Sequence, residues 1–283
     1  MVLERMLNPF SLKKRPWEMF VAGFAYSFVG VGLAHLVFSE VSDLLMVFLI
    51  VLATLPTLYV TIRNEQELEL KYEKESSLLK EHTKVIVFLI FLFLGITTAL
   101  TLIYIVAPEP FVTSTFGLQN DAINNVNQVV HGQVTGSVAK GTILSRIFLN
   151  NVKVLFFCLV FSFIYGSGAI FILTWNASVI AAAIGSLFKS ELAKTAAVVG
   201  SSTTAGYVGS ATFSFFRFMT HGILEIAAYF IAGLAGGIIS IAIIKHRLKE
   251  NKVIIDSLDL VLISIALLFA AAIIEVYVTP ALF

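Results

Sequence analysis

The chain has 283 residues, of which 58% are apolar and only 13% are charged. A typical soluble domain has about a quarter charged residues, so this composition excludes an ordinary soluble protein and predicts an integral membrane protein. The net charge of +1 provides no general basic field, so we expect no nucleic acid partner. The single cysteine, Cys158, cannot form an intrachain disulfide.

Seven apolar segments are long enough to cross a bilayer as helices, which takes about 20 residues each. We therefore expect an all-α, polytopic bundle of seven transmembrane spans, in one integral membrane domain over residues 1–283. Pro108 and Pro110 end the third span, and Gly166-Ser167-Gly168 forms the turn between the fourth and fifth. The predicted spans cover residues 17–38, 44–62, 85–107, 148–165, 169–188, 218–244 and 258–278.

Lysine and arginine are concentrated in alternate connections, and connections that are rich in them stay in the cytoplasm. The N-terminal segment and the connections 63–84 and 245–252 carry most of these residues. We therefore expect a multi-pass protein of the cell membrane with a cytoplasmic N-terminus and an external C-terminus. An alternative with six spans makes residues 148–173 one crossing and residues 175–188 a re-entrant segment.

Three connecting stretches have patterns of their own. Acidic and basic residues alternate over 63–84, which predicts a charged helical hairpin that is either only solvated or a docking handle for a cytosolic partner. The small residues of 192–214 favour close packing, with a re-entrant or surface segment as the alternative. The external connection 108–145 has apolar residues at helical spacing, which predicts an amphipathic surface helix that packs on the spans, on lipid or on a partner. Those apolar residues are Ile123, Val126, Val130 and Val134.

Polar side chains inside the spans are the main functional signal, because a charge in hydrocarbon costs about 2.5–3.5 kcal/mol on insertion scales. Several of them fall at one depth in the outer half of the membrane, and His221 and Glu225 share one helical face. We predict a cluster in which Lys153 neutralises Glu225 while His221 and asparagines complete the hydrogen bonds. The predicted set is Asn150, Asn151, Lys153, Asn176, His221, Glu225 and Glu275, with Arg146 and Arg217 at its rim.

Three interpretations of this cluster are open: a buried ion pair that holds the helices in register, a binding site for an ion or small solute, or catalysis. A histidine and a glutamate one turn apart could activate water. However, no nucleophile elbow or HExxH motif accompanies them, and one His with one Glu is too few ligands for zinc. We therefore assign no catalytic residue, metal or cofactor, and we expect a protein that is not an enzyme.

A longer pattern runs from Asn150 to Ile244. It comprises Asn150-Asn151, then Gly166, Gly168, Asn176 and Gly185, then His221-Gly222-Ile223-Leu224-Glu225 and the glycines at 233, 236 and 237. This pattern resembles the stage II sporulation protein M family of integral membrane proteins. The resemblance implies a scaffold-like multispan protein without established enzymatic activity. In sporulating bacteria the family holds peptidoglycan-remodelling enzymes at the membrane, and that role is not carried over to this chain. The resemblance also implies that Asn150, Asn151, Asn176, His221 and Glu225 are the shared polar positions.

Two functions are expected. The first is a membrane scaffold that associates with itself through small-residue faces and presents residues 108–145 and 189–217 to envelope partners. The second is a transporter or channel-like protein that binds an ion, a lipid headgroup or a small solute at Lys153, His221 and Glu225. In both, membrane lipids surround the spans.

Overall fold

A computed structural model describes residues 16–69, 75–131, 137–165, 169–201, 203–244 and 251–283. These residues are almost entirely helical, and no strand occurs among them. The elements are α3 (Trp17–Val37), η1 (Ser39–Val41), α4 (Ser42–Glu69), α5 (Glu75–Val106), α6 (Glu109–Thr115), α7 (Gly117–His131), α8 (Ser137–Tyr165), α9 (Ala169–Val199), α10 (Thr204–Ile244), α11 (Asn251–Ile273), the π-helical η2 (Ile274–Val278) and α12 (Thr279–Leu282).

The described part of the chain contains seven helices that are long and apolar enough to cross a membrane. This confirms the predicted all-α bundle of seven spans. α8 and α9 are continuous helices of 29 and 31 residues. The stretch 175–188 therefore lies in the middle of a full-length helix, and the six-span alternative is wrong. The predicted turn at residues 166–168 lies outside the described residues.

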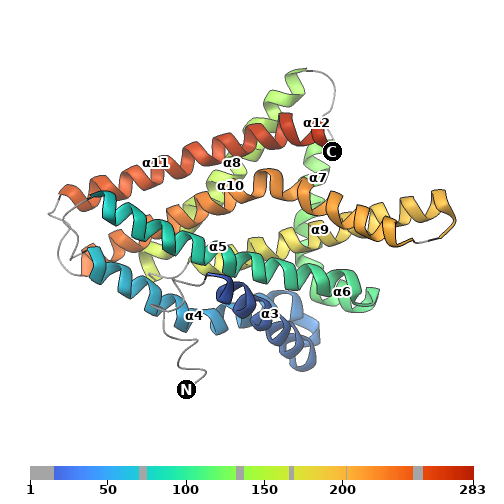
Figure 1. Ribbon diagram of the computed structural model, residues 1–283, viewed down its shortest axis with the longest axis horizontal. Coiled ribbons are helices and arrows are strands. Elements are labelled where there is room, and N and C mark those ends of the chain that lie inside the picture. The colour runs from blue at the N-terminus through green and yellow to red at the C-terminus, as the bar shows by residue number, and fades with distance from the viewer. Residues whose placement is uncertain (1–15, 70–74, 132–136, 166–168, 202, 245–250) are drawn as a thin grey trace.

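The helices form two groups of three with α9 between them (Figure 1). In the first group α3 packs on both α4 and α5, and in the second α10 packs on both α8 and α11. α9 contacts α4 and α5 on one side and α8 and α10 on the other. Three alanines of α9, Ala177, Ala181 and Ala182, are completely buried. Small side chains at such contacts let helices approach closely in a bilayer, where little hydrophobic force draws them together.

Glycines bring α3 and α5 into contact backbone to backbone. A Cβ atom built on Gly23 would lie 2.5 Å from the carbonyl oxygen of Leu92, and one built on Gly95 would overlap the carbonyl oxygen of Phe20. Any larger residue at these two positions would have to push a whole helix away. The two glycines therefore set the distance between α3 and α5.

The predicted amphipathic helix is α7, which packs on α4 and α9 (Figure 1). Ile123 of α7 packs against the buried core, so the apolar face contacts the protein's own spans at that position. The side chains of Val126, Val130 and Val134 lie outside what the structure describes. α7 thus links the first group of helices to α9.

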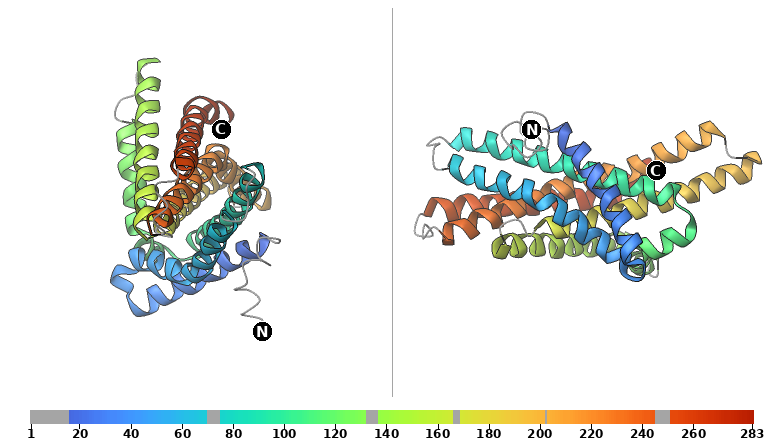
Figure 2. Two further views of the ribbon diagram at one scale, coloured as in Figure 1. Left: turned by 90° about the vertical axis from the view of Figure 1, so that its left-hand side faces the viewer. Right: turned by 90° about the horizontal axis from the view of Figure 1, so that it is seen from below.

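α9 and α10 extend well past the ends predicted for their spans. The connection predicted over 189–217 is instead a helical hairpin, which projects beyond the other helices (Figures 1 and 2). The small-residue stretch 192–214 lies within this hairpin and is helical on both sides of its turn. α10 has 41 residues and is about 60 Å long, twice the hydrocarbon thickness of a bilayer. Hydropathy detects where a helix leaves the membrane and not where the helix ends.

Local capping explains where the hairpin turns. Gly200 adopts a φ of +80° and its N–H donates to the carbonyl oxygen of Ala196, at 2.8 Å, which ends α9 with a left-handed residue. The Thr203 hydroxyl then accepts a hydrogen bond from the N–H of Gly206, at 3.1 Å. This is an N-terminal cap, which favours the start of α10 at this point.

Candidate functional site

α8 and α10 cross in close contact at Gly236. A Cβ atom built on Gly236 would lie 2.5 Å from the carbonyl oxygen of Leu159 and 2.9 Å from the Cβ of Ser162. Because the two helices run in the same direction, residues before Leu159 on α8 lie opposite residues before Gly236 on α10. The crossing therefore sets which polar side chains of the two helices face each other.

Asn151 of α8 and Glu225 of α10 contact each other on the N-terminal side of this crossing in both helices. The side-chain amide of Asn151 donates a hydrogen bond to Oε1 of Glu225. Asn151 is buried and Glu225 is half-buried. Because asparagine is neutral, this contact satisfies a carboxylate oxygen but does not neutralise its charge.

His221 lies one turn before Glu225 and faces the end of the seventh span. Its Nδ1 is 3.4 Å from the hydroxyl oxygen of Thr279, and its Nε2 is 4.0 Å from Oε1 of Glu275. Glu275 belongs to the π-helical turn η2, a feature that is rare in proteins and frequent at functional sites. Asn151, His221, Glu225, Glu275 and Thr279 together form what we call the membrane polar cluster.

The structure brings four residues of the predicted set together: Asn151, His221, Glu225 and Glu275. The predicted ion pair between Lys153 and Glu225 is wrong. Lys153 is exposed, because it follows Asn151 by two residues and two such residues lie on nearly opposite sides of a helix. Asn150 is exposed as well.

The remaining predicted residues lie outside the cluster. Asn176 is on α9, where its amide nitrogen is buried and has no hydrogen-bond partner in the described part of the chain. Arg217 precedes His221 by one turn of α10, is exposed and lies 5.9 Å from the ring centre of Phe213. Arg146 is exposed on α8. Arg217 is thus one helical turn from His221, a position that corresponds to the predicted rim. The described contacts do not place Arg146 beside the cluster.

The charges of the cluster are unbalanced. It contains two carboxylates and one imidazole, and among the described residues no lysine or arginine pairs with Glu225 or Glu275. No group of three or more His, Cys, Asp or Glu side chains in the described ranges is arranged to hold a metal ion. The arrangement is thus suited to holding a proton or a small cation near a carboxylate.

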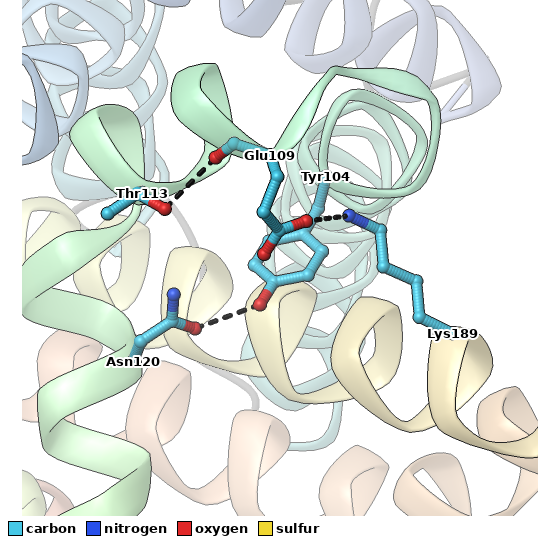
Figure 3. Close-up of polar contacts among 5 residues, drawn as sticks. All are labelled: Tyr104, Glu109, Thr113, Asn120 and Lys189. Carbon is cyan, nitrogen blue, oxygen red and sulfur yellow. Dashed lines mark hydrogen bonds and ion pairs between the residues drawn. The ribbon is translucent and has the colours of Figure 1, made fainter. Parts of the chain in front are cut away.

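Sequence reasoning missed Thr279 and a second polar network at the base of the hairpin (Figure 3). The Tyr104 hydroxyl donates to Oδ1 of Asn120 at 3.0 Å, which joins α5 to α7. Nζ of Lys189 is 3.2 Å from Oε2 of Glu109 and 5.1 Å from the ring centre of Tyr104. These contacts attach α9 to α5 and α6, and no local spacing in the sequence indicates them.

Gln119 of α7 is a second residue that the sequence did not reveal. Its side chain is fully buried, and its amide nitrogen lies 3.2 Å from both the carbonyl oxygen of Asp43 and the hydroxyl of Ser178. The Asp43 carboxylate in turn accepts a hydrogen bond from the N–H of Leu118 at 3.2 Å. A glutamine in a polar stretch is usually read as exposed, so only the packing of α7 on α4 and α9 identifies it as a buried link.

Comparison with known protein families gives one match. A family model described as Stage II sporulation protein M matches residues 84–280. The match runs from within α5 into α12, so it includes the whole membrane polar cluster and the hairpin but neither α3 nor α4. It extends well beyond the resemblance over 150–244. No curated protein and no solved structure was found to match the chain.

Proposed function

This chain belongs to the stage II sporulation protein M family, and on that premise we propose that it is a non-enzymatic membrane scaffold that recruits partner proteins through the α9–α10 hairpin. The hairpin, residues 189–217, carries the proposal because it projects beyond the bundle. By the distribution of lysine and arginine we expect this end to be external.

The tip of the hairpin exposes apolar side chains. Val198 is 86% exposed and Val208 is 61% exposed, with Tyr207 beside it at 48%. Within the bilayer such exposure is normal, but α10 is about twice as long as a bilayer requires. Apolar groups that stand clear of the hydrocarbon and are uncovered favour a protein partner.

The base of the hairpin is held firmly, as a scaffold requires. Lys189 binds Glu109 and lies over the Tyr104 ring, and Tyr104 binds Asn120 (Figure 3). A Cβ atom built on Gly185 would lie 2.5 Å from Cδ1 of Tyr104, so α5 and α9 are also in close contact. These contacts support a hairpin that stands at one angle and presents its tip to a partner.

A photoreactive amino acid at Val208 of the full-length protein in native membranes tests this proposal. We expect a discrete protein adduct, and its mass distinguishes a second copy of the chain from another protein. The matched control is Leu262, which lies near the middle of α11, is 55% exposed and should crosslink only to lipid. With the probe moved to Val198, Val208→Asp should remove the adduct without changing thermal stability. Absence of a protein adduct at both hairpin positions would refute the scaffold role.

The unbalanced charge of the membrane polar cluster favours a second candidate, a proton or cation transporter. Two carboxylates at one level of the bilayer repel each other, and each charge is costly in hydrocarbon. The described contacts offer only His221 and Asn151 as compensation. A proton or a small cation would relieve both costs, and its release toward either side of the membrane would be transport.

Purified protein in liposomes tests this candidate directly. Under the transport hypothesis, an imposed proton or potassium gradient should decay faster than in empty liposomes, and Glu225→Gln should abolish the difference. Glu191→Gln is the control, because Glu191 pairs with Lys194 on the exposed hairpin and lies away from the cluster. Equal decay in protein-containing and empty liposomes would count against transport, as would flux that Glu225→Gln leaves unchanged.

A further inference from the structure

One face of α8 is polar and exposed although it belongs to a membrane span. Arg146, Asn150 and Lys153 are all exposed, within the span Lys140–Phe163. Their spacings of four and three residues place them on the same side of the helix. α8 contacts α10, α11 and η2 with its other side, so this face is turned away from those helices.

The same face becomes apolar toward the other end of the helix. Phe156 and Phe157 are 56% and 49% exposed, and they begin within one turn of Lys153. The face therefore has hydrogen-bond donors near the end of the membrane that we expect to be external and aromatic rings at greater depth. This order of groups is that of a phospholipid, with its headgroup at the surface and its acyl chains below.

The chemistry of the polar part selects an anion. Lysine and arginine have only donors, and the asparagine amide adds two more. The carboxylates described at this depth, Glu225 and Glu275, face the membrane polar cluster on the other side of α8. A second copy of the chain would thus have no free carboxylate from the cluster to offer these cations. Long cationic side chains in a span commonly reach toward the phosphate layer.

We propose that this face of α8 binds an anionic phospholipid. Its phosphodiester lies against Arg146, Asn150 and Lys153, and one acyl chain lies along Phe156 and Phe157. The site is separate from the hairpin and from the membrane polar cluster, so the proposal goes beyond a scaffold role. It also gives Lys153, which the rotation of α8 turns away from Glu225, a counter-charge in the lipid.

Native mass spectrometry of the full-length protein in nonionic detergent tests the proposal, with phosphatidylglycerol and phosphatidylcholine as added probes. We expect phosphatidylglycerol to be retained preferentially. Lys153→Met should weaken its retention by about tenfold, the ratio expected for one lost charge-assisted hydrogen bond. Lys153→Arg should keep retention, and Lys194→Met, which removes an equal charge from the hairpin, should leave it unchanged. A size-exclusion profile identical to that of the unmodified protein shows that Lys153→Met is folded.

Three results would overturn the proposal. The first is equal retention of phosphatidylglycerol by the unmodified protein and by Lys153→Met. The second is displacement of phosphatidylglycerol by millimolar inorganic phosphate, which would indicate an anion site with no role for the acyl chain. The third is a dimer that Lys153→Met dissociates, since this would make the face a contact between two copies of the chain.

Discussion

Replacing Gly95 with alanine should destabilise the bundle by about 2–3 kcal/mol, the upper part of the range of about 1–3 kcal/mol for forcing extra atoms into a packed interior. The added methyl group would overlap the carbonyl oxygen of Phe20, which belongs to the backbone of α3 and cannot rotate away. α3 and α5 would have to separate, and the contact of Gly23 with Leu92 would be lost with them. Reversible unfolding of the purified protein in mixtures of mild detergent and dodecyl sulfate measures the change.

Gly32→Ala is the matched control for this prediction. Gly32 is in α3, the helix that Gly95 of α5 contacts, and a Cβ atom built on Gly32 would have no other atom within 4 Å. The same methyl group should therefore stabilise the protein by about 0.5–1 kcal/mol, because alanine favours helix over glycine. The two substitutions are expected to have opposite signs. A Gly95→Ala protein as stable as Gly32→Ala would contradict the close contact between α3 and α5.

Replacing Asn151 with leucine should cost about 2–3 kcal/mol, because it removes the hydrogen-bond donor of the half-buried Glu225 without changing the size of the side chain much. Glu225→Leu alone should be costly for the same reason, since it leaves the buried amide of Asn151 without its acceptor. The double replacement should be closer to the unmodified protein than the sum of the two. The same unfolding measurement, arranged as a double-mutant cycle, should give a coupling of about 1.5–3 kcal/mol.

Asn150→Leu is the control for this cycle. Asn150 is adjacent in sequence, but it is rotated by about 100° around α8 and is exposed. Its replacement should therefore change stability by no more than about 0.5 kcal/mol. Strictly additive effects of Asn151→Leu and Glu225→Leu would show that the two side chains do not interact. That result would remove the central contact of the membrane polar cluster.

The spans could be predicted from the sequence because hydropathy is a local property. A run of about 20 apolar residues must become a helix in lipid whatever its neighbours are, since no water is present to bind an open backbone. The hairpin was missed because α9 and α10 remain helical after their hydropathy falls. The N-terminal cap of α10 at Thr203 was the local signal that could have revealed it.

The composition of the candidate site was predicted only in part. Counting residues along each helix placed Asn151, Lys153, His221 and Glu225 at similar depth. Depth does not determine which way a side chain points, and α8 has apolar residues on all sides, so its pattern does not indicate a buried face. The rotation of α8 is set by its contact with Gly236 of α10, and that contact turns Asn151 inward and Lys153 outward.

By itself the sequence determined the membrane environment and the number of spans, because both follow from the free energy of moving short stretches of chain into lipid. Only the tertiary structure decided which of the polar groups meet. Partners on α8, α10 and η2 are far apart in the chain, and backbone contacts at glycine select one rotation of each helix among several that the lipid alone would accept.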